Sequence, residues 1–520
     1  MTAATNSKLA AELPAVCYQT AQLRNGEQAA ADAVGVSMAK LMVRAGEAIW
    51  QASQAYSFDH IVVVAGPGNN GGDGYVVANL ALAAKKSVVV YATAAKSALA
   101  QQMREEFTAA GGVVKPLQKL AEVDFSGATL VVDALLGNGL SRDVEGEFAA
   151  AILQVNEARQ QGQVTAVVCA DVPSGLQSDS GQPLGTCFYA DTTVTFIALK
   201  AGLLTGAAAD YIGELKFAGL GVADEFANQQ QPFAKRLSCE SVAAYLTPRK
   251  RTAHKGDAGT LLVLGGAPGM AGAAVLAGKA ALRSGAGKVM VGCHPDSQAV
   301  IASQQAELMV HAISAEHALQ LLLKQADTVV VGPGLGQSEW AQMVWQHAVA
   351  SGKPLVVDAD ALRLLAQQPL PPTSSWVLTP HPGEAAELLK STTKQISAQR
   401  WDAVNELYQK YLSESLNSAG NSAGIVLLKG AGTVIRTQQG YAVNTSGTPA
   451  MASGGMGDVL SGIIGALLAQ KFPPEQAVYL AVWIHGRAAE VAAKNGERGT
   501  IASDLLDVLR ILVNQPNWHQ

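Results

Sequence analysis

The chain of 520 residues has few charged side chains and only five cysteines. Charged residues make up 15% of the sequence, the net charge is -5, and no block of Lys and Arg occurs, which argues against nucleic acid as a main partner. The cysteines are scattered and none belongs to a CxxC pair, so the sequence indicates neither a disulfide framework nor a zinc site. This cysteine usage suits a reducing compartment, and we predict a cytoplasmic protein.

Long uninterrupted apolar runs are also missing. No stretch is long enough to span a bilayer, and the amino-terminal residues include Lys8 and Glu12 without a long apolar core, so we expect neither a membrane segment nor a signal peptide. Hydrophobic residues (49%) and glycines (52 of them) are abundant instead. Such a chain can bury large cores, and its length predicts about two to four domains.

Short β-branched segments alternate with helical segments along the chain, which predicts an α/β fold. A helical stretch is expected over 17–53. The expected strands are 60–64, 87–91, 130–133, 164–169 and 192–196, and then 260–264, 328–331, 355–357, 376–379 and 425–428. A polar segment without periodicity separates the two groups. We therefore predict domains over 1–228 and 240–520, joined by a linker over 229–239.

Polar, glycine-rich loops follow three strands of the first group. Because the carboxyl ends of parallel strands share one edge of a sheet, these loops predict one site. Each loop alone is explained by a turn, but three together favour a site whose oxygen ligands suit a hard cation. The first loop is not a standard dinucleotide motif, because it lacks GxGxxG with an acid about twenty residues later. The polar residues are Asn69, Asn70, Asp73, Asp133, Asn138, Asp171 and Ser174.

The second group ends with a glycine-rich stretch followed by a charge-free segment. Gly454, Gly455 and Gly457 precede Asp458, and residues 459–470 predict a buried helix. Amides at such a helix start can bind phosphate oxygens, and Asp458 could take a proton from a hydroxyl aimed at that phosphate. The plain alternative is a turn in which Asp458 caps the helix.

Several long motifs resemble known domains. GPGNNGGDG, VVDALLGNGLSRD and ADVPSG together resemble the NAD(P)H-hydrate epimerase domain, whereas HKGDAGTLLVLGG, VVVGPGLG, LTPHPGEAAELL, LLKGAGT and MASGGMGDVLSG resemble the NAD(P)H-hydrate dehydratase domain. Found in this order, they resemble the bifunctional NAD(P)H-hydrate repair enzymes over 17–225 and 240–512. The resemblance implies an N-terminal Rossmann-like three-layer sandwich and a C-terminal ribokinase-like α/β domain.

The resemblance also implies a function. The epimerase of this family interconverts the R and S hydrates of NADH and NADPH (NADHX and NADPHX). The dehydratase acts on the S form and couples water loss to nucleotide hydrolysis, with ADP as the nucleotide in bacterial members. The implied cofactors are K⁺ and Mg²⁺, and the implied partners are NADHX, NADPHX and ADP, with neither nucleic acid nor membrane. We also expect a homo-oligomer.

In the first domain the resemblance assigns two loops to the hydrate. It would place K⁺ on Asn70, Asp133 and Ser174. Asp171 would contact the altered ring, and we hypothesise that it is the acid/base for epimerisation. Lys200 is an alternative acid/base, and its plain interpretation is a surface lysine. The two hydrate-binding loops comprise Asn69, Asn70, Gly71, Gly72 and Asp73, and Gly137, Asn138, Gly139, Leu140, Ser141, Arg142 and Asp143.

In the second domain the resemblance assigns Gly334, His381 and Asp458 to the hydrate. Asp458 would deprotonate the ring hydroxyl, which would attack the terminal phosphate of ADP, and departure of that phosphate would restore the double bond. Two alternatives remain open: a small-molecule kinase for this domain, and a mere binding module for the first. The implied nucleotide-binding residues are Lys429, Gly430, Ala431, Gly432 and Thr433, with Gly455 and Gly457 near the phosphates.

Overall fold

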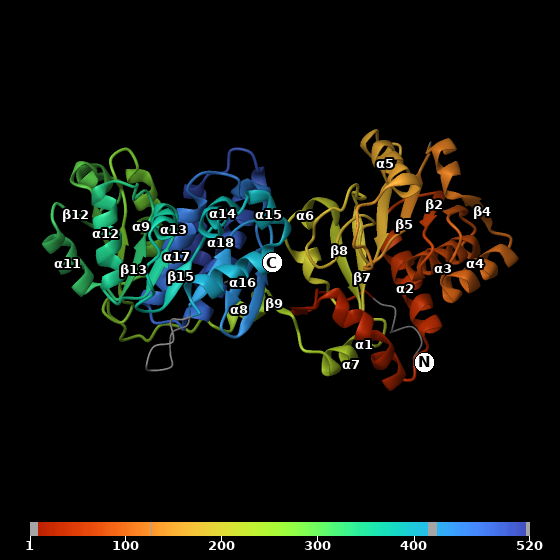
Figure 1. The fold of residues 1–520 in the computed structure, drawn as a ribbon, viewed down its shortest axis with the longest axis horizontal. Helices are drawn as coiled ribbons and strands as arrows, with labels where there is room; N and C mark the ends of the chain where they lie inside the picture. The colour runs from red at the N-terminus through yellow and green to blue at the C-terminus, as the bar shows by residue number, and fades with distance from the viewer. Residues whose placement is uncertain (1–8, 126, 414–423, 516–520) are drawn as a thin grey trace. The chain divides into compact units, whose positions relative to one another are not determined.

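The computed structural model describes residues 9–125, 127–413 and 424–515. The chain divides into two compact units between Lys235 and Arg236 (Figure 1). This division falls inside the segment 229–239 that we expected to be a linker. The same segment contains the strand β9 (Ala234–Leu237), which pairs antiparallel with β1 (Val16–Cys17).

The first unit is built on a parallel sheet with the strand order β4-β3-β2-β5-β6-β7-β8. The chain moves outward from β2 to β4 and resumes at β5 on the other side of β2. The strand order therefore reverses between β2 and β5, which is where open α/β sheets bind ligands. The strands are β2 (His60–Ala65), β3 (Ser87–Ala92), β4 (Val113–Pro116), β5 (Thr129–Ala134), β6 (Ala166–Ala170), β7 (Thr192–Phe196) and β8 (Glu214–Ala218).

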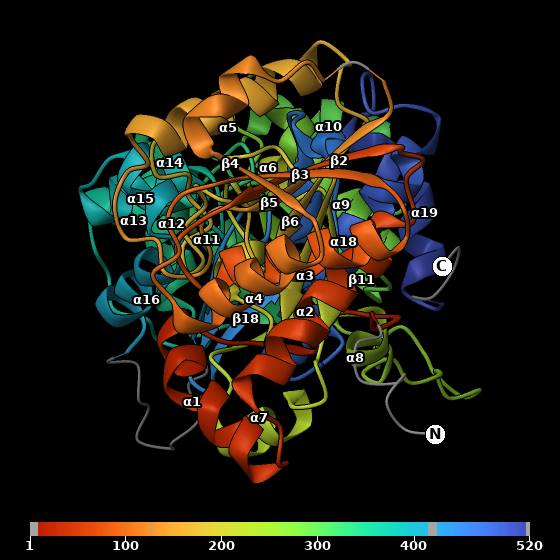
Figure 2. The ribbon, with the colours of Figure 1, turned by 90° about the vertical axis from the view of Figure 1, so that its right-hand side faces the viewer.

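Both faces of this sheet are buried. In β2, Ile61 and Val63 pack into one apolar cluster and Val62 and Val64 into another, because successive side chains point to opposite faces. Helices α2, α3 and α4 lie on one face and α5 on the other (Figure 2). The expected three-layer arrangement is confirmed. The helices are α1 (Thr20–Ala33), α2 (Met38–Ser53), α3 (Asn69–Ala83), α4 (Ala98–Ala109), α5 (Gly146–Gln160), α6 (Ala208–Tyr211) and α7 (Ala223–Gln229).

The single helical stretch expected over 17–53 was wrong. The segment forms β1, α1 and α2, and the two helices are separated around Gly35, which has a φ of +67°. A left-handed residue of this kind ends a helix, and the apolar periodicity on either side of it does not reveal the break.

The second unit also has its strand order reversed once. The order is β18-β17-β16-β15-β14-β13-β10-β11-β12, with parallel pairing from β12 to β16 and antiparallel pairing to β17 and β18. The reversal lies between β10 and β13. The strands are β10 (Thr260–Leu264), β11 (Lys288–Cys293), β12 (Leu308–Ala312), β13 (Thr328–Val331), β14 (Leu355–Val357), β15 (Trp376–Leu378), β16 (Ile425–Leu428), β17 (Thr433–Thr437) and β18 (Gly440–Asn444).

Helices cover the second sheet as well. On one face α9, α17, α18 and α19 share a single apolar cluster with the strands. The helices of this unit are α8 (Cys239–Ala243), α9 (Ala271–Arg283), α10 (Gln298–Gln304), α11 (Glu316–Gln325), α12 (Glu339–Ala350), α13 (Asp360–Gln367), α14 (Pro382–Leu389), α15 (Thr393–Ala398), α16 (Arg400–Tyr411), α17 (Met456–Ala469), α18 (Pro474–Ala492) and α19 (Leu505–Leu512).

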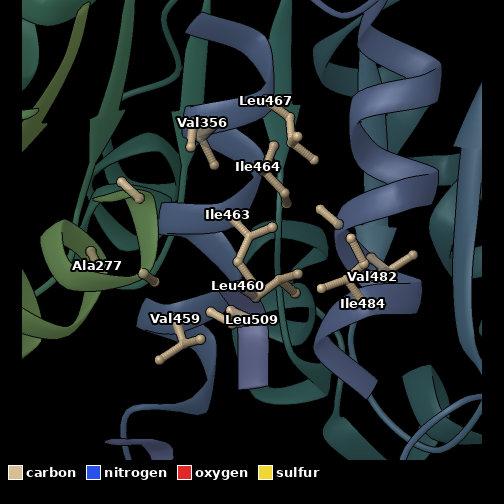
Figure 3. Packing of buried hydrophobic residues seen from close by; sticks show 14 of the residues in the cluster. Ala277, Val356, Val459, Leu460, Ile463, Ile464, Leu467, Val482, Ile484 and Leu509 are labelled. Atoms are coloured by element: carbon tan, nitrogen blue, oxygen red, sulfur yellow. The ribbon is translucent and has the colours of Figure 1, made fainter. Parts of the chain in front are cut away.

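Helix α17 is the buried helix expected over 459–470. Its side chains Val459, Leu460 and Ile463 are buried against α9, α18 and α19 (Figure 3). Each such burial stabilises the fold by roughly 1.5–3 kcal/mol. A Cβ on Gly462 would lie 2.2 Å from the carbonyl oxygen of Ala277, so this glycine permits the close approach of α9. The glycine-rich turn therefore precedes a firmly held helix.

All five cysteines are buried. Burial raises the pKa of the Cys293 thiol to about 11 and that of Cys169 well above its ordinary value. In the described part of the chain, no helix is both long and apolar enough to cross a membrane.

Candidate active sites

A pocket of about 160 Å³ lies at the carboxyl edge of the first sheet, where the strand order reverses. Of the residues predicted to bind the hydrate, the pocket is lined by Asn69, Asn70, Asp73, Gly137, Asn138 and Asp171. The predicted residues Gly71, Gly72, Gly139, Leu140, Ser141, Arg142 and Asp143 are not among the described residues that line it. The pocket also contains two ionisable side chains, Glu27 and Lys200.

The glycines after β2 serve close packing. Helix α3 begins at Asn69, so the second half of the expected loop is helical. A Cβ on Gly71 would lie 2.1 Å from the carbonyl oxygen of Gly66, and one on Gly72 would lie 2.5 Å from the Met42 sulfur. The absence of these Cβ atoms lets the start of α3 approach the loop after β2 and helix α2 closely. Asn69 and Asp73 are four residues apart and therefore share one side of the helix, toward the pocket.

Asp171 follows β6 and is held by a buried lysine. Its φ is +64°, and its Oδ1 accepts hydrogen bonds from Lys200 Nζ, Thr195 Oγ1 (3.3 Å) and the Phe196 amide (3.2 Å). The Lys200 side chain is 0% exposed, so its interpretation as a surface lysine was wrong. Asp171 Oδ2 accepts no hydrogen bond from the described residues, which leaves this oxygen for a molecule in the pocket.

Two further carboxyl groups face Asp171. Burial, reinforced by the charge of Asp171, raises the pKa of Glu27 and raises that of Asp73 well above its ordinary value. The site can therefore hold a neutral carboxylic acid beside a carboxylate that is paired with a lysine, which suits proton transfer in both directions. No local pattern marks Glu27 as a site residue, because a single Glu in an amphipathic helix is ordinarily exposed.

The three residues predicted to bind K⁺ come together around the backbone of Leu136. Ser174 donates to Asp133 through its amide (2.7 Å) and its hydroxyl (2.5 Å), and its Oγ accepts from the Leu136 amide (2.7 Å). Asn70 Nδ2 donates to the Leu136 carbonyl (2.9 Å), which leaves Oδ1 for a ligand. Asp133 is fully buried and has no cationic partner among the described residues. An all-oxygen set around an uncompensated buried charge fits a hard monovalent cation.

The second site centres on Lys429 at the end of β16. Its Nζ lies 2.7 Å from Asp358 Oδ1, after β14, and 3.7 Å from Glu384 Oε2, after β15. Asp358 also accepts from Ser461 Oγ in α17 at 2.6 Å. The network thereby connects the ends of three strands to the helix that carries Asp458. Burial raises the pKa of Asp458 to about 7, and the negative charge of Asp358 is the second-largest cause.

His381 is the N-cap of α14. Its Nδ1 accepts from the amides of Gly383 (3.0 Å) and Glu384 (3.3 Å), and Glu384 Oε2 accepts from the His381 amide (2.8 Å). Because Nδ1 is an acceptor, the neutral imidazole carries its proton on Nε2. Its Nε2 lies 3.3 Å from Glu384 Oε1, and the side chain is about half exposed, so the outer edge of the ring can contact a ligand. Gly334 has a φ of +59° and packs on α9, as Gly455 also does.

The loop that contains Lys429, Gly430, Ala431, Gly432 and Thr433 is held by Arg400. This buried guanidinium donates to the carbonyl groups of Leu428 (3.0 Å), Lys429 (3.4 Å) and Gly432 (3.3 Å). Burial lowers its pKa to about 10. Sequence reasoning missed Arg400, because its burial depends on packing between α16 and β16, which no local pattern shows.

We expect Gly455→Ala to weaken nucleotide binding and destabilise the second unit by about 1–3 kcal/mol. Gly455 has a φ of +87°, and a Cβ there would lie 2.5 Å from Leu276 Cδ1. Gly454→Ala is the matched control, because its Cβ would have nothing within 4 Å. Thermal unfolding and the KM for the nucleotide measure both effects. Equal Tm and equal KM values for the two variants would show that the turn does not need a glycine at position 455.

The chain is similar to known proteins over nearly its whole length. It is 41% identical to the bifunctional NAD(P)H-hydrate repair enzyme Nnr of Coxiella burnetii, covering 96% of this chain and 99% of that one. It is also 41% identical to the protein of the same name from Escherichia coli, covering 99% and 97%. The solved ADP/ATP-dependent NAD(P)H-hydrate dehydratase from Bacillus subtilis, co-crystallised with ATP and Mg²⁺, is 30% identical over 53% of this chain and 96% of its own, with a TM-score of 0.47.

The folds and the two carboxylate sites define a two-domain α/β enzyme with one Rossmann-like and one ribokinase-like unit. Family models for the YjeF-related protein N-terminus and for NAD(P)H-hydrate dehydratase match residues 38–202 and 261–510. The chain belongs to the family of bifunctional NAD(P)H-hydrate repair enzymes.

Proposed function

We propose that both units repair hydrated nicotinamide cofactors. The first unit interconverts the R and S forms of NADHX and NADPHX, and the second dehydrates the S form with hydrolysis of ADP. The observation that carries this proposal is the pairing, in one chain, of a lysine-held carboxylate at one strand-order reversal with a carboxylate at a glycine-rich helix start. We also propose that the enzyme works in the cytoplasm as a homo-oligomer.

In the first unit, Asp171 exchanges a proton with the hydroxyl of the hydrated ring. Inverting the carbon that carries this hydroxyl requires a proton on the departing oxygen and removal of one from the incoming oxygen. Asp171 Oδ2 is available for one of these steps, and a neutral Asp73 or Glu27 can supply the other. Lys200 positions Asp171 through Oδ1. The hydrate lies between Asn69, Asn138 and this group of carboxyls.

Asn70, Asp133 and Ser174 would hold K⁺ in the first unit. The cation would supply the positive charge that the buried Asp133 lacks, and it would fix the loops after β5 and β6 on which the hydrate rests. Bound there, it would compensate the charge and order the site, while the proton transfers stay with Asp171 and its neighbours.

We predict that K⁺ stabilises the first unit only when Asp133 is ionised. Burial raises the pKa of Asp133 from 3.8 to about 6, so without the cation the stability falls as the pH rises between these values. Above this range K⁺ should raise the Tm, by roughly 2–4 °C per kcal/mol of binding. Below it, where Asp133 is protonated, the gain should disappear.

Thermal unfolding of the full-length protein in KCl and in choline chloride measures this difference. Asp133→Asn should abolish the gain at every pH, whereas Asp210→Asn, an exposed carboxylate on α6, should keep it. An equal gain in the wild type and in Asp133→Asn would rule out this site.

In the second unit, Asp458 acts as the base. It takes the proton of the ring hydroxyl, which then attacks the terminal phosphate of ADP and displaces AMP. The phosphate then leaves the ring carbon, and loss of a proton from the adjacent carbon restores the double bond. The amides at the start of α17 and the Lys429 ammonium group stabilise the charge that develops on the phosphate. The other residues near the nucleotide are Gly430, Ala431, Gly432, Thr433, Gly455 and Gly457, and Gly334 and His381 contact the hydrate. Mg²⁺ would enter with the nucleotide phosphates and neutralise their charge.

The test is an assay with a mixture of R and S NADPHX, ADP, Mg²⁺ and K⁺. Recovery of NADPH absorbance from both epimers, with one free phosphate released per NADPH, is the expected result. Phosphate retained on an organic product would instead indicate a kinase. No NADPH with the ADP intact would overturn the proposal.

A further inference from the structure

A second hollow in the first unit takes no part in the chemistry above. It has a volume of about 340 Å³ and lies where β3 and β4 end at the carboxyl edge of the sheet. Its lining includes Thr93 after β3, Lys115 in β4, and the side chain of Arg104 in α4. The hollow is therefore on the opposite half of the sheet from Asp171.

The strand order indicates what such a hollow can bind. In doubly wound sheets each half takes one mononucleotide of a dinucleotide, and the pyrophosphate lies at the glycine loop of the central strand. Here that loop follows β2, and Asp171 follows β6 in the half that would take the nicotinamide. The other half consists of β3 and β4. Three strand spacings separate β3 from β6, about 14 Å, so a molecule that reaches both must be extended.

The side chains at this hollow suit a phosphate better than a ribose hydroxyl. Folds that bind an unphosphorylated ribose place an acid about twenty residues after the glycine loop, at the end of the next strand. In this chain Thr93, Ala94 and Ala95 occupy that position. Arg104 and Lys115 supply positive charge beside it, and guanidinium groups match the geometry of phosphate oxygens.

The bonding of these side chains leaves them available. Thr93 Oγ1 is buried without a hydrogen-bond partner, and Arg104 is half-buried with no carboxylate within 4 Å among the described residues. Lys115 Nζ lies 5.9 Å from the centre of the Tyr91 ring. One carboxylate, Glu147, also lines the hollow, and it accepts a hydrogen bond from Gln118 Nε2.

We propose that this hollow binds the 2′-phosphate on the adenosine of NADPHX and so makes the first unit favour NADPHX over NADHX. Arg104 and Lys115 hold the phosphate oxygens. The inference rests on the proposed function of the first unit and adds the substrate selectivity of that site.

The first experiment compares epimerisation of NADPHX and NADHX by the full-length protein. Arg104→Gln and Lys115→Gln should each raise the KM for NADPHX roughly tenfold or more, since each removes a charged hydrogen bond. The KM for NADHX should stay unchanged. Lys119→Gln is the matched control, because Lys119 is an exposed neighbour paired with Glu122 and outside the hollow. Equal effects on both hydrates, or no effect on either, would overturn the inference.

A second experiment separates this inference from the proposed function. Equilibrium dialysis measures adenosine 2′,5′-bisphosphate bound to the full-length protein, with ADP in excess to fill the second unit. Binding should be at least tenfold weaker in the double variant Arg104→Gln/Lys115→Gln than in Lys119→Gln. Binding that depends on Arg104 in a protein without epimerase activity would support the phosphate site and remove the proposed function. Full epimerase activity, with bisphosphate binding unchanged in the double variant, would support the proposed function and overturn the phosphate site.

Discussion

Asp458→Asn is expected to lower kcat for the ADP-dependent recovery of NADPH by about 10²–10⁴-fold. The side-chain amide of the variant cannot accept the proton of the ring hydroxyl. The backbone N–H groups at the start of α17 are unchanged and can still bind the nucleotide. The KM for ADP should therefore change little. Asp507→Asn, an exposed carboxylate on α19, is the matched control and should retain the wild-type rate. A variant at position 458 that keeps a substantial rate would show that another group is the base.

The pH dependence of the same step follows from the burial of Asp458. Its pKa is raised to about 7, so the basic carboxylate form is the majority only above that pH. The kcat of the wild type should fall about tenfold per pH unit below 7 and level off above it. Stopped assays of phosphate release from S-NADPHX across this range measure the profile. A rate that is flat through 7 would contradict the assignment of Asp458 as the base.

Asp171→Asn is expected to lower the rate of R-to-S interconversion by about 10²–10⁴-fold while the dehydratase keeps its activity on the S form. In an R/S mixture, the variant should recover the S fraction quickly and then slow to the spontaneous rate. The reciprocal variant Asp458→Asn should interconvert the epimers without producing NADPH. Each variant is thus the folding control for the other, since each retains the activity of the unaltered unit. Loss of both activities in Asp171→Asn would indicate general misfolding instead.

The sequence predicts most strands of both sheets because their burial on both faces demands uninterrupted β-branched and aliphatic residues. The edge that carries the polar loops follows from the parallel arrangement alone. The start of α3 at Asn69 could not be predicted from the sequence, since Asn and Gly are poor helix formers. The helix begins there because its first turn packs against Gly66 and Met42. Charged residues that act from other elements, such as Glu27 and Arg400, were also beyond prediction. Their roles depend on tertiary contacts that leave no local pattern.

The polar networks show the same limit. Asp358 and Lys429 each follow a predicted strand, but the ion pair between them depends on the order in which β14, β15 and β16 lie in the sheet. Lys200 is the clearest example of a role that the sequence does not reveal. A lysine after a strand is ordinarily exposed, and only the folded chain reveals that it is buried against Asp171.

The five buried cysteines have a consequence for when this enzyme can work. Peroxides and electrophiles react with exposed thiolates, and burial here both excludes them and keeps the Cys169 and Cys293 thiols protonated. The protein should therefore stay active through an oxidative burst that disables enzymes with exposed catalytic thiols. A repair catalyst whose thiols are all buried can continue to return damaged cofactor to the reduced pool.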